Sequence, residues 1–165
     1  MSEHAEIRNK EREVSDEGLL FSVLDRAAYG VLSMAESGRP YCVPMSYVRM
    51  GRSLFFHTAK VGRKVETIDA SPRVAFIVVD HAEYLPGKLD FEYLSVYVEG
   101  LAKDVTDHDK KLSAYEAMIS KYESGGYKKK IPESCLEESQ IISLEIFRIT
   151  GKRNSHSSEF HSSQG

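Results

Sequence analysis

The sequence predicts a single mainly β domain, with six short antiparallel strands forming a closed or split barrel and a few helices at its periphery. Most of the apolar residues occur in short runs that are separated by tight-turn signals. Helical spacing of apolar residues is confined to three segments, and the length of 165 residues is usual for one domain. A barrel would pair strand edges that an open sheet leaves exposed.

The chain divides into a polar N-terminal arm over 1–14, a folded domain over 15–153 and a polar tail over 154–165. The tail is rich in Ser and His, and its composition is typical of disorder. The domain opens with a helix that we expect to start at Ser15 and end near Gly30. Acidic residues follow Ser15, and apolar residues then recur with helical spacing.

The next segment predicts a meander of three strands over 31–35, 41–48 and 53–58. Turn residues separate these strands, and the second strand alternates in polarity. Pro44 lies inside that second strand and cannot donate to a ladder. It therefore marks a bulge, an edge strand or a place where another group approaches.

The second half of the chain continues the alternation of strands and helices. Gly100 lies near the end of a long strand and predicts a bend of the kind that barrels need at their corners. The expected elements are a helix over 62–70, strands over 73–80, 92–103 and 141–149, a helix starting at Asp107, and loops over 81–90 and 123–139.

Composition and charge exclude or disfavour several classes of protein. The formal net charge of −3 gives no bulk attraction to nucleic acid. The charged N-terminus lacks the apolar segment of a signal peptide, and no apolar run approaches the roughly 20 residues of a membrane helix. Cys42 and Cys135 lie far apart and outside any metal-ligand spacing, which favours reduced thiols in a cytoplasm.

The most informative segment for function covers residues 55–64, where a strand ends and a helix begins. A helix N-terminus presents unpaired N–H groups and a positive dipole end, which favour anions. Lys60, Arg63 and Lys64 add cations at the same place, and Thr58 adds a hydroxyl donor. A bound phosphate would explain cations that otherwise oppose the helix dipole. The alternative is that they are ordinary solvated surface charges.

Other residues of this region permit more than one interpretation. His57 could act as an acid or base or satisfy a hydrogen bond, and no second ligand lies near it in a metal-binding spacing. The segment 43–46 could leave ladder groups free for a ligand or belong to an edge strand with a bulge. Tyr93 and Ser95 could form a face for a planar ring or an outer barrel surface. Cys42 has no adjacent base, which disfavours a catalytic thiol.

The segment LFFHTAKVGRKVETIDASPRVAF resembles the signature of the pyridoxamine 5'-phosphate oxidase-like FMN-binding split barrels. More narrowly, it resembles the branch that includes the 5-nitroimidazole-resistance proteins. The matching motifs are His57-Thr58-Ala59, Gly62-Arg63-Lys64 and Ser71-Pro72-Arg73-Val74. PYCVPMSY at 40–47, FEYLSVYVEGLAK at 91–103 and the terminal residues 149–152 are also similar, so the resemblance covers roughly residues 10–153.

The resemblance implies a six-stranded antiparallel split β-barrel that forms a homodimer, with FMN in a groove between the subunits. It places the FMN phosphate beside Thr58, Arg63 and Lys64, with Gly62 opening the helix. Thr58 stands where serine is commoner and keeps the hydroxyl. The other residues implied at the cofactor are Val43, Pro44, Met45 and Ser46 along the ring, Phe56, His57 and Ala59 at its flanks, and Tyr93 and Ser95 from the other subunit.

Three functions agree with these observations, because a fold alone does not fix an activity. The first is an FMN-dependent oxidoreductase that reduces a small acceptor such as a nitroimidazole-type compound, with His57 as the nearest acid–base candidate. The second is a non-catalytic module that binds a flavin or senses a ligand. The third is a related barrel that holds haem or a deazaflavin. The substrate-binding C-terminal motif of the oxidase is not evident, which argues against vitamin B6 oxidation.

Overall fold

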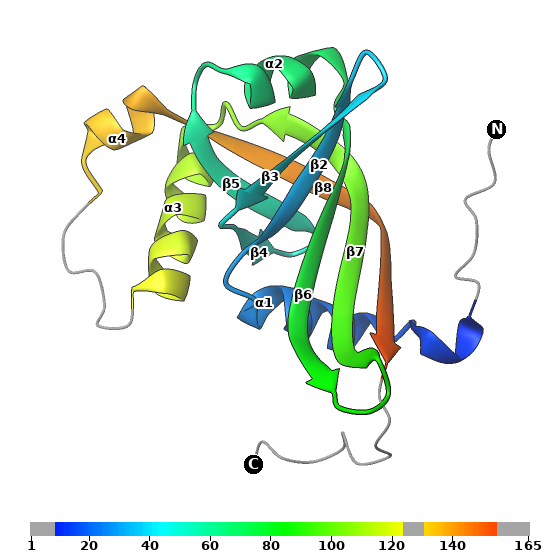
Figure 1. Ribbon diagram of the computed structural model, residues 1–165. Coiled ribbons are helices and arrows are strands. Elements are labelled where there is room, and N and C mark those ends of the chain that lie inside the picture. The colour runs from blue at the N-terminus through cyan, green and yellow to red at the C-terminus, as the bar shows by residue number, and fades with distance from the viewer. Residues whose placement is uncertain (1–8, 124–130, 155–165) are drawn as a thin grey trace.

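A computed structural model describes residues 9–123 and 131–154, and it confirms a mainly β fold with peripheral helices. All its strands belong to one antiparallel sheet that curls around the core (Figure 1). The described part has eight strands, two more than expected. They are β1 (Glu13–Val14), β2 (Gly30–Glu36), β3 (Arg39–Met45), β4 (Val48–Met50), β5 (Ser53–Ala59), β6 (Arg73–Leu85), β7 (Asp90–Asp104) and β8 (Ser139–Asn154).

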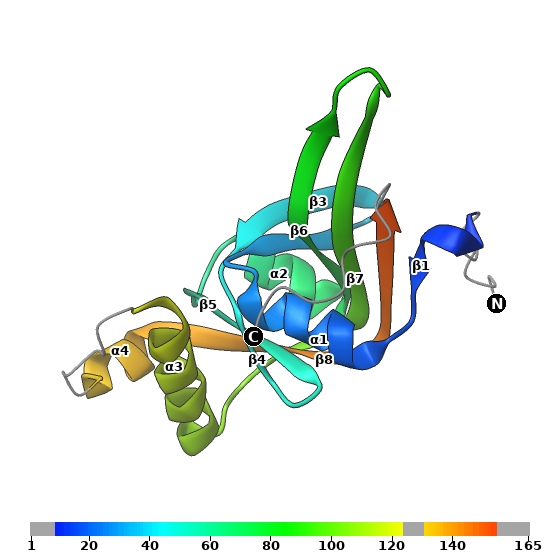
Figure 2. The same ribbon diagram turned by 90° about the horizontal axis from the view of Figure 1, so that it is seen from below.

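Helices close the ends and one side of this sheet. Seen from below, α1 crosses one end of the barrel, while α2 covers the opposite end (Figures 1 and 2). The α3 helix packs beside β4, and α4 follows it in the chain. The helical elements are a 3₁₀ turn η1 (Lys10–Arg12), α1 (Glu17–Arg26), α2 (Arg63–Ala70), α3 (His108–Tyr122) and α4 (Glu133–Glu138). No helix in the described part is long and apolar enough to cross a membrane.

The strand order is β3-β2-β6-β7-β8-β5-β4, with β1 paired to β8. Its two ends, β3 and β4, are consecutive in the chain, yet the sheet order joins them by no ladder in the described part. The barrel is therefore split between these two strands. At this break the Tyr47 backbone N–H donates to the Tyr122 hydroxyl at 2.9 Å instead of to a neighbouring strand.

Three expectations about element bounds were wrong. The strand expected over 41–48 is interrupted at Ser46 and Tyr47 and forms both β3 and β4. The loop expected over 81–90 is mostly ladder, because residues 81–85 pair with 90–94 and leave only a short turn. The loop expected over 123–139 contains α4. In addition, the end of the expected arm pairs with β8, where Val14 lies opposite Gly151. Residues 155–165 of the expected tail lie outside the described residues.

The core has two parts that share β5. Phe56 and Phe76 pack inside the barrel with their rings 5.2 Å apart, and α1 contributes Leu20 and Leu24. On the other face of β5, Phe55 joins a smaller cluster beneath α3. Because successive side chains point to opposite faces, β5 is buried on both sides and fixes the place where α2 begins.

The bend expected at Gly100 is confirmed. The β7–β8 register shifts between Glu99 and Gly100. A Cβ atom at this position would lie 2.3 Å from the Glu145 carbonyl oxygen. Only glycine lets the two backbones approach this closely, so the bend depends on this residue.

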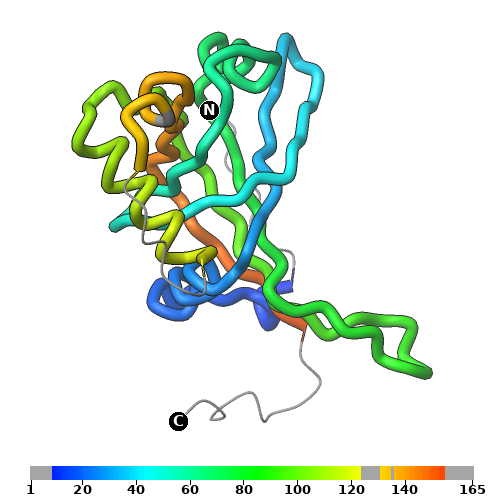
Figure 3. Tube along the Cα trace, turned by 90° about the vertical axis from the view of Figure 1, so that its left-hand side faces the viewer, coloured from blue at the N-terminus to red at the C-terminus, as the bar shows by residue number. Residues whose placement is uncertain are grey.

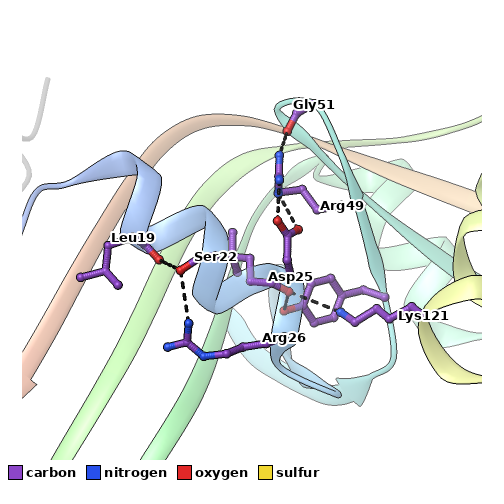
Figure 4. Close-up of polar contacts among 9 residues, drawn as sticks. Leu19, Ser22, Asp25, Arg26, Arg49, Gly51 and Lys121 are labelled. Atoms are coloured by element: carbon purple, nitrogen blue, oxygen red, sulfur yellow. Dashed lines mark hydrogen bonds and ion pairs between the residues drawn. The ribbon is translucent and has the colours of Figure 1, made fainter. Parts of the chain in front are cut away.

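Polar side chains close the C-terminal end of α1 (Figure 4). Asp25 accepts hydrogen bonds from Arg49 at 2.6 and 2.8 Å, and Lys121 reaches across from α3 to the Leu24 carbonyl. The Tyr47 hydroxyl donates to that same carbonyl at 2.6 Å, and its ring lies 3.9 Å from the Lys121 ammonium. Burial lowers the pKa of Lys121 to about 8 and raises that of Tyr47. The phenol therefore stays a donor at neutral pH.

We expect Tyr47→Phe to lower the free energy of unfolding by about 1 kcal/mol, since a buried hydrogen bond contributes about that much. For a chain of this size, that loss corresponds to a fall in Tm of about 2–4 °C. Thermal or urea unfolding would measure it. Tyr29→Phe is the matched control, because that ring is 65% exposed, and its Tm should not change. Equal stability of both variants and the natural chain would contradict this role of the hydroxyl.

Candidate functional site

The N-terminus of α2 has the features of an anion site. The residue that caps this end is Gly62, with a φ of 127°. Because glycine has no side chain, no capping side chain accepts a bond from the first N–H groups of the helix. The first helical backbone bond runs from the Glu66 N–H to the Gly62 carbonyl. The N–H groups of Arg63, Lys64 and Val65 precede that bond and therefore have no intrahelical acceptor. These N–H groups and the helix dipole favour a negative group at this end.

Lys64 is the cation that the fold places most specifically at this end of the helix. Its side chain is partly buried, and its ammonium lies 3.2 Å from the Met45 sulfur, which links α2 to β3. A thioether is a weak acceptor and offsets little of the cost of burying a charge. Burial accordingly lowers the pKa of Lys64. No described carboxylate forms an ion pair with it, so an anion would satisfy it well.

Arg63 occupies a different environment from Lys64. Its guanidinium donates to Glu36 at 3.1 Å and stacks over the Tyr41 ring at 4.3 Å. Both partners come from the β2–β3 hairpin, so Arg63 ties this hairpin to α2. The resemblance implied that Arg63 and Lys64 both hold the phosphate, together with Thr58. The structure gives Arg63 a partner that already balances its charge.

The end of β5 presents its residues to two sides of the sheet. Phe56 and Thr58 face the barrel interior and are buried, whereas His57 and Ala59 are exposed on the α3 side. The Thr58 side chain shares its face with Gln140, its partner on β8. The buried Oε1 atom of Gln140 accepts no hydrogen bond within the described chain. A hydroxyl and an amide therefore adjoin the start of α2.

His57 lies against α3. Its ring centroid is 5.4 Å from that of Tyr115, whose hydroxyl hydrogen-bonds to the Ser139 hydroxyl. Desolvation and the nearby Lys64 ammonium lower the pKa of His57. The imidazole is therefore neutral at neutral pH, and it can accept a proton or donate one hydrogen bond at the edge of the site.

The segment 43–46 lies at the split of the barrel. β3 pairs with β2 alone, and Pro44 lies opposite Val31 on this edge strand, which explains how a proline is tolerated. Val43 is partly buried, Pro44 and Ser46 are exposed, and Met45 is buried beneath Lys64. The contact between Met45 and Lys64 brings this edge strand to the start of α2.

Tyr93 and Ser95 lie elsewhere in the same chain. Ala102 of β7 bonds to Pro72, which follows α2, and Ser95 precedes Ala102 by seven residues. That separation is about 23 Å along a strand. The Ser95 hydroxyl instead donates to the Lys152 carbonyl at 3.3 Å, and the Lys152 ammonium lies 5.9 Å from the Tyr93 ring. Both residues therefore lie along β7 away from its contact with Pro72, and they pair with β8.

Several contacts of the site were absent from the sequence interpretation. Glu36 ends β2 and Tyr41 lies in β3, and no local sequence pattern indicated that they hold Arg63. Tyr115 lies in the helix that was expected to start at Asp107, and its approach to His57 depends on how that helix packs. Among residues 9–123 and 131–154, no group of three or more His, Cys, Asp or Glu side chains could hold a metal ion.

Comparison with known proteins identifies relatives of this fold. The chain is similar to a candidate 5-nitroimidazole antibiotic resistance protein from Bacteroides thetaiotaomicron, with 17% identity, a TM-score of 0.75 and 85% of each chain covered. It is also similar to a flavocytochrome from Azotobacter vinelandii, with 16% identity, a TM-score of 0.78 and coverage of 90% of this chain and 72% of that one.

A third similar structure is an FAD-binding protein from Mesorhizobium loti, with 25% identity, a TM-score of 0.65 and coverage of 87% of this chain and 98% of that one. A search of curated proteins found no match. The family model described as pyridoxamine 5'-phosphate oxidase matches residues 16–153, which include every part of the candidate site. The resemblance read from the motifs is thus confirmed, and the chain belongs to the pyridoxamine 5'-phosphate oxidase family.

Proposed function

We propose that this protein binds a flavin mononucleotide whose phosphate lies at the N-terminus of α2, and that it uses the flavin as an oxidoreductase. One observation carries the proposal. The partly buried Lys64 ammonium, without a described carboxylate partner, lies beside N–H groups that lack intrahelical acceptors. A phosphate satisfies both kinds of donor, since charge-assisted hydrogen bonds to phosphate are among the strong ones.

The remaining donors suit the rest of such a ligand. Thr58 and Gln140 lie on one face beside α2, and the edge strand β3 approaches through Met45. Val43, Pro44 and Ser46 continue along this edge, where Pro44 lacks an N–H and the outer ladder groups are unpaired. A planar ring along β3 would pack on apolar side chains and still reach backbone groups, as cofactor sites commonly require.

Related proteins support a flavin without fixing its kind. The Mesorhizobium loti neighbour is an FAD-binding protein, and one from Mycobacterium smegmatis binds FAD and haem. FMN and FAD both carry a phosphate on the ribityl chain, so the α2 end suits either. We favour FMN because the family is that of pyridoxamine 5'-phosphate oxidase. The pigment released from the protein would separate FMN, FAD and haem by mass and spectrum.

The bound flavin would supply hydride or electron transfer, and the protein would supply binding, orientation and the electrostatics of the ring. In this assignment Lys64 and the α2 N–H groups hold the phosphate, and Arg63 holds the β2–β3 hairpin against α2. His57 is neutral and lies at the edge of the site, where it can accept a proton or donate one hydrogen bond. The acceptor we propose is a small compound such as a nitroimidazole.

We also propose that the working unit is a homodimer. The outer face of β6 and β7 exposes large apolar side chains, with Ile77 36%, Val79 55% and Tyr97 39% exposed. They lie together, because Ile77 pairs with Tyr97 and Val79 pairs with Ser95. Contiguous exposed apolar patches commonly mark interaction sites. A second copy covering this face would also bring another Tyr93 and Ser95 near the site.

Lys64→Met should weaken FMN binding at least about tenfold, because a charge-assisted hydrogen bond contributes about 1.5–3 kcal/mol and 1.4 kcal/mol is tenfold. Riboflavin lacks the phosphate, so its affinity should change less than about twofold. Flavin fluorescence quenching would measure both. Lys60→Met is the matched control, since Lys60 is exposed in the same loop and should matter little. An equal loss for FMN and riboflavin would contradict the phosphate assignment.

The preference for FMN over riboflavin should fall as pH rises through the pKa of Lys64 in the flavin-free protein. Burial lowers this pKa, and FMN binds best when the ammonium is charged, so affinity is lost on the alkaline side. The phosphate is fully ionised above about pH 7, given a second pKa near 6. Titrations from pH 7 to 10 would measure the ratio of the two affinities. In Lys64→Met that ratio should stay flat, and an identical decline would assign the effect to another group.

Purified protein should carry a yellow pigment at about one flavin per subunit, and it should oxidise a reduced nicotinamide with a nitro or quinone acceptor. Absorbance spectra, mass analysis of the released pigment and steady-state turnover would test these expectations in turn. A bound flavin without turnover would replace the oxidoreductase with a non-catalytic flavin-binding module. A protein that no flavin can colour would overturn the proposal.

A further inference from the structure

The last turn of α3 lies beside the C-terminal end of α1, and Lys121 reaches from one helix to the other (Figures 3 and 4). Its ammonium lies 3.9 Å from the centroid of the Tyr47 ring and 5.5 Å from that of Tyr122. The side chain is partly buried, and its one hydrogen-bond acceptor in the described part of the chain is the Leu24 carbonyl at 3.3 Å. The flavin site proposed above uses none of these residues.

The surroundings of Lys121 satisfy an ammonium poorly. An ammonium has three N–H donors, and the Leu24 carbonyl already accepts the Tyr47 hydroxyl at 2.6 Å. The bond of 3.3 Å from Lys121 to this carbonyl is longer than the usual range of about 2.7–3.2 Å. Asp25 acts on the charge of this lysine, but Arg49 holds both of its carboxylate oxygens, at 2.6 and 2.8 Å. Among the described residues, no carboxylate forms an ion pair with Lys121.

Partial burial of this ammonium makes Lys121 nucleophilic near neutral pH. Burial lowers its pKa to about 8, despite the opposing effect of the Asp25 carboxylate. At pH 7.5 about a quarter of the side chains are then neutral, against about 0.1% for a lysine with an ordinary pKa near 10.4. The neutral amine is the nucleophilic form of lysine. The faces of the two tyrosine rings attract the ammonium, so the charged form persists beside the neutral one.

We propose that Lys121 is an acylation site, at which the lysine amine takes a small acyl group from an acyl phosphate or a thioester. The neutral amine attacks the carbonyl carbon of the donor and forms a C–N bond. The C–O bond of the acyl phosphate or the C–S bond of the thioester breaks, phosphate or a thiol leaves, and the amine releases one proton to water. The reaction involves no oxidation or reduction and no residue of the proposed flavin site, so it goes beyond that function.

An amide suits this place better than other adducts of lysine. An acylated lysine keeps one N–H donor, which matches the single acceptor at Leu24, and it carries no charge to desolvate. A carbamate formed from carbon dioxide would instead add a negative charge near Asp25 and over the negative face of the Tyr47 ring. A neutral imine formed from an aldehyde would keep no N–H donor for the carbonyl. The contacts therefore favour an acyl donor over carbon dioxide or an aldehyde.

Site-resolved acylation rates test the proposal. The full-length protein is incubated near neutral pH with acetyl phosphate in one arm and with an acetyl thioester in another, and peptide mass spectrometry follows each lysine over time. Lys110 is the internal control, because it lies in the same helix and 5.6 Å from the Phe55 ring but is exposed. We expect Lys121 to react at least about tenfold faster than Lys110, since its larger neutral fraction outweighs its lower basicity.

Faster reaction at Lys121 in either arm supports the proposal, and the arm in which it occurs identifies the donor. Equal or slower reaction at Lys121 in both arms would overturn it. In urea the ratio of the two rates should fall to about one, because the low pKa depends on the folded surroundings. A ratio unchanged on unfolding would assign the preference to local sequence and would also overturn the proposal. All these outcomes are measurable on flavin-free protein, so the proposed cofactor can fail while this site stands.

The dependence of stability on pH provides a second test, with Lys121→Met as the uncharged variant. A lysine whose pKa is lower in the folded than in the unfolded chain destabilises the fold below its folded pKa, and that cost disappears as pH rises. The Tm of the natural chain should therefore rise relative to that of Lys121→Met between about pH 7 and 9.5. The other groups that face the ammonium are the Asp25 carboxylate and the phenols of Tyr47 and Tyr122. Burial raises the pKa of both phenols, so they stay neutral over this range.

Lys110→Met, in the same helix, is the matched control, and its Tm difference from the natural chain should not change with pH. A difference between the natural chain and Lys121→Met that also stays constant would mean that the surroundings of Lys121 satisfy its ammonium. That result would overturn the proposal even if other lysines are acylated.

Discussion

The burial of β5 on both faces is the constraint on which the rest of the site depends. Phe56 packs into the barrel, and Phe55 packs under α3. The ladder from Ser53 to Ala59 against β8 fixes the register of this strand. A shift by one residue would exchange the two faces and expose one aromatic cluster. The strand therefore ends at one defined place, and α2 begins there with its N–H groups toward the split edge of the barrel.

The position of α2 also places the Lys64 ammonium where a positive charge is unfavourable unless an anion binds it. A lysine in the first turn opposes the helix dipole, and partial burial against the Met45 sulfur adds a desolvation cost. Arg63, in the adjacent position, avoids this cost through Glu36 and Tyr41. Arg63 therefore holds the β2–β3 hairpin, whereas Lys64 can bind an anion. Local destabilisation of this kind is common where a protein binds a charged ligand.

Sequence patterns predicted the barrel and its bend at Gly100, and an edge strand was one of three explanations for Pro44, because turn residues and alternation report local geometry. They failed where distant residues decide the outcome. At the break between β3 and β4, the Tyr47 N–H bonds to the hydroxyl of Tyr122, which lies 75 residues away in the chain. The ladder beyond Asp80 looked like a loop because Pro86 and Gly87 dominate its composition, although the residues around them pair.

The candidate site likewise combines features that a local sequence pattern indicates with features that depend on residues far away in the chain. The strand-to-helix motif identified Thr58, Arg63 and Lys64, since a cationic helix start is a local feature. The different roles of Arg63 and Lys64 depend on the β2–β3 hairpin, which no local pattern could place. Ser95 lies about 23 Å along β7 from Ala102, which bonds to Pro72 after the C-terminal end of α2, and Tyr93 lies farther along the same strand. In the proposed homodimer a second subunit would bring these two residues to the site, and the exposed side chains of Ile77, Val79 and Tyr97 form the face on which that subunit would pack.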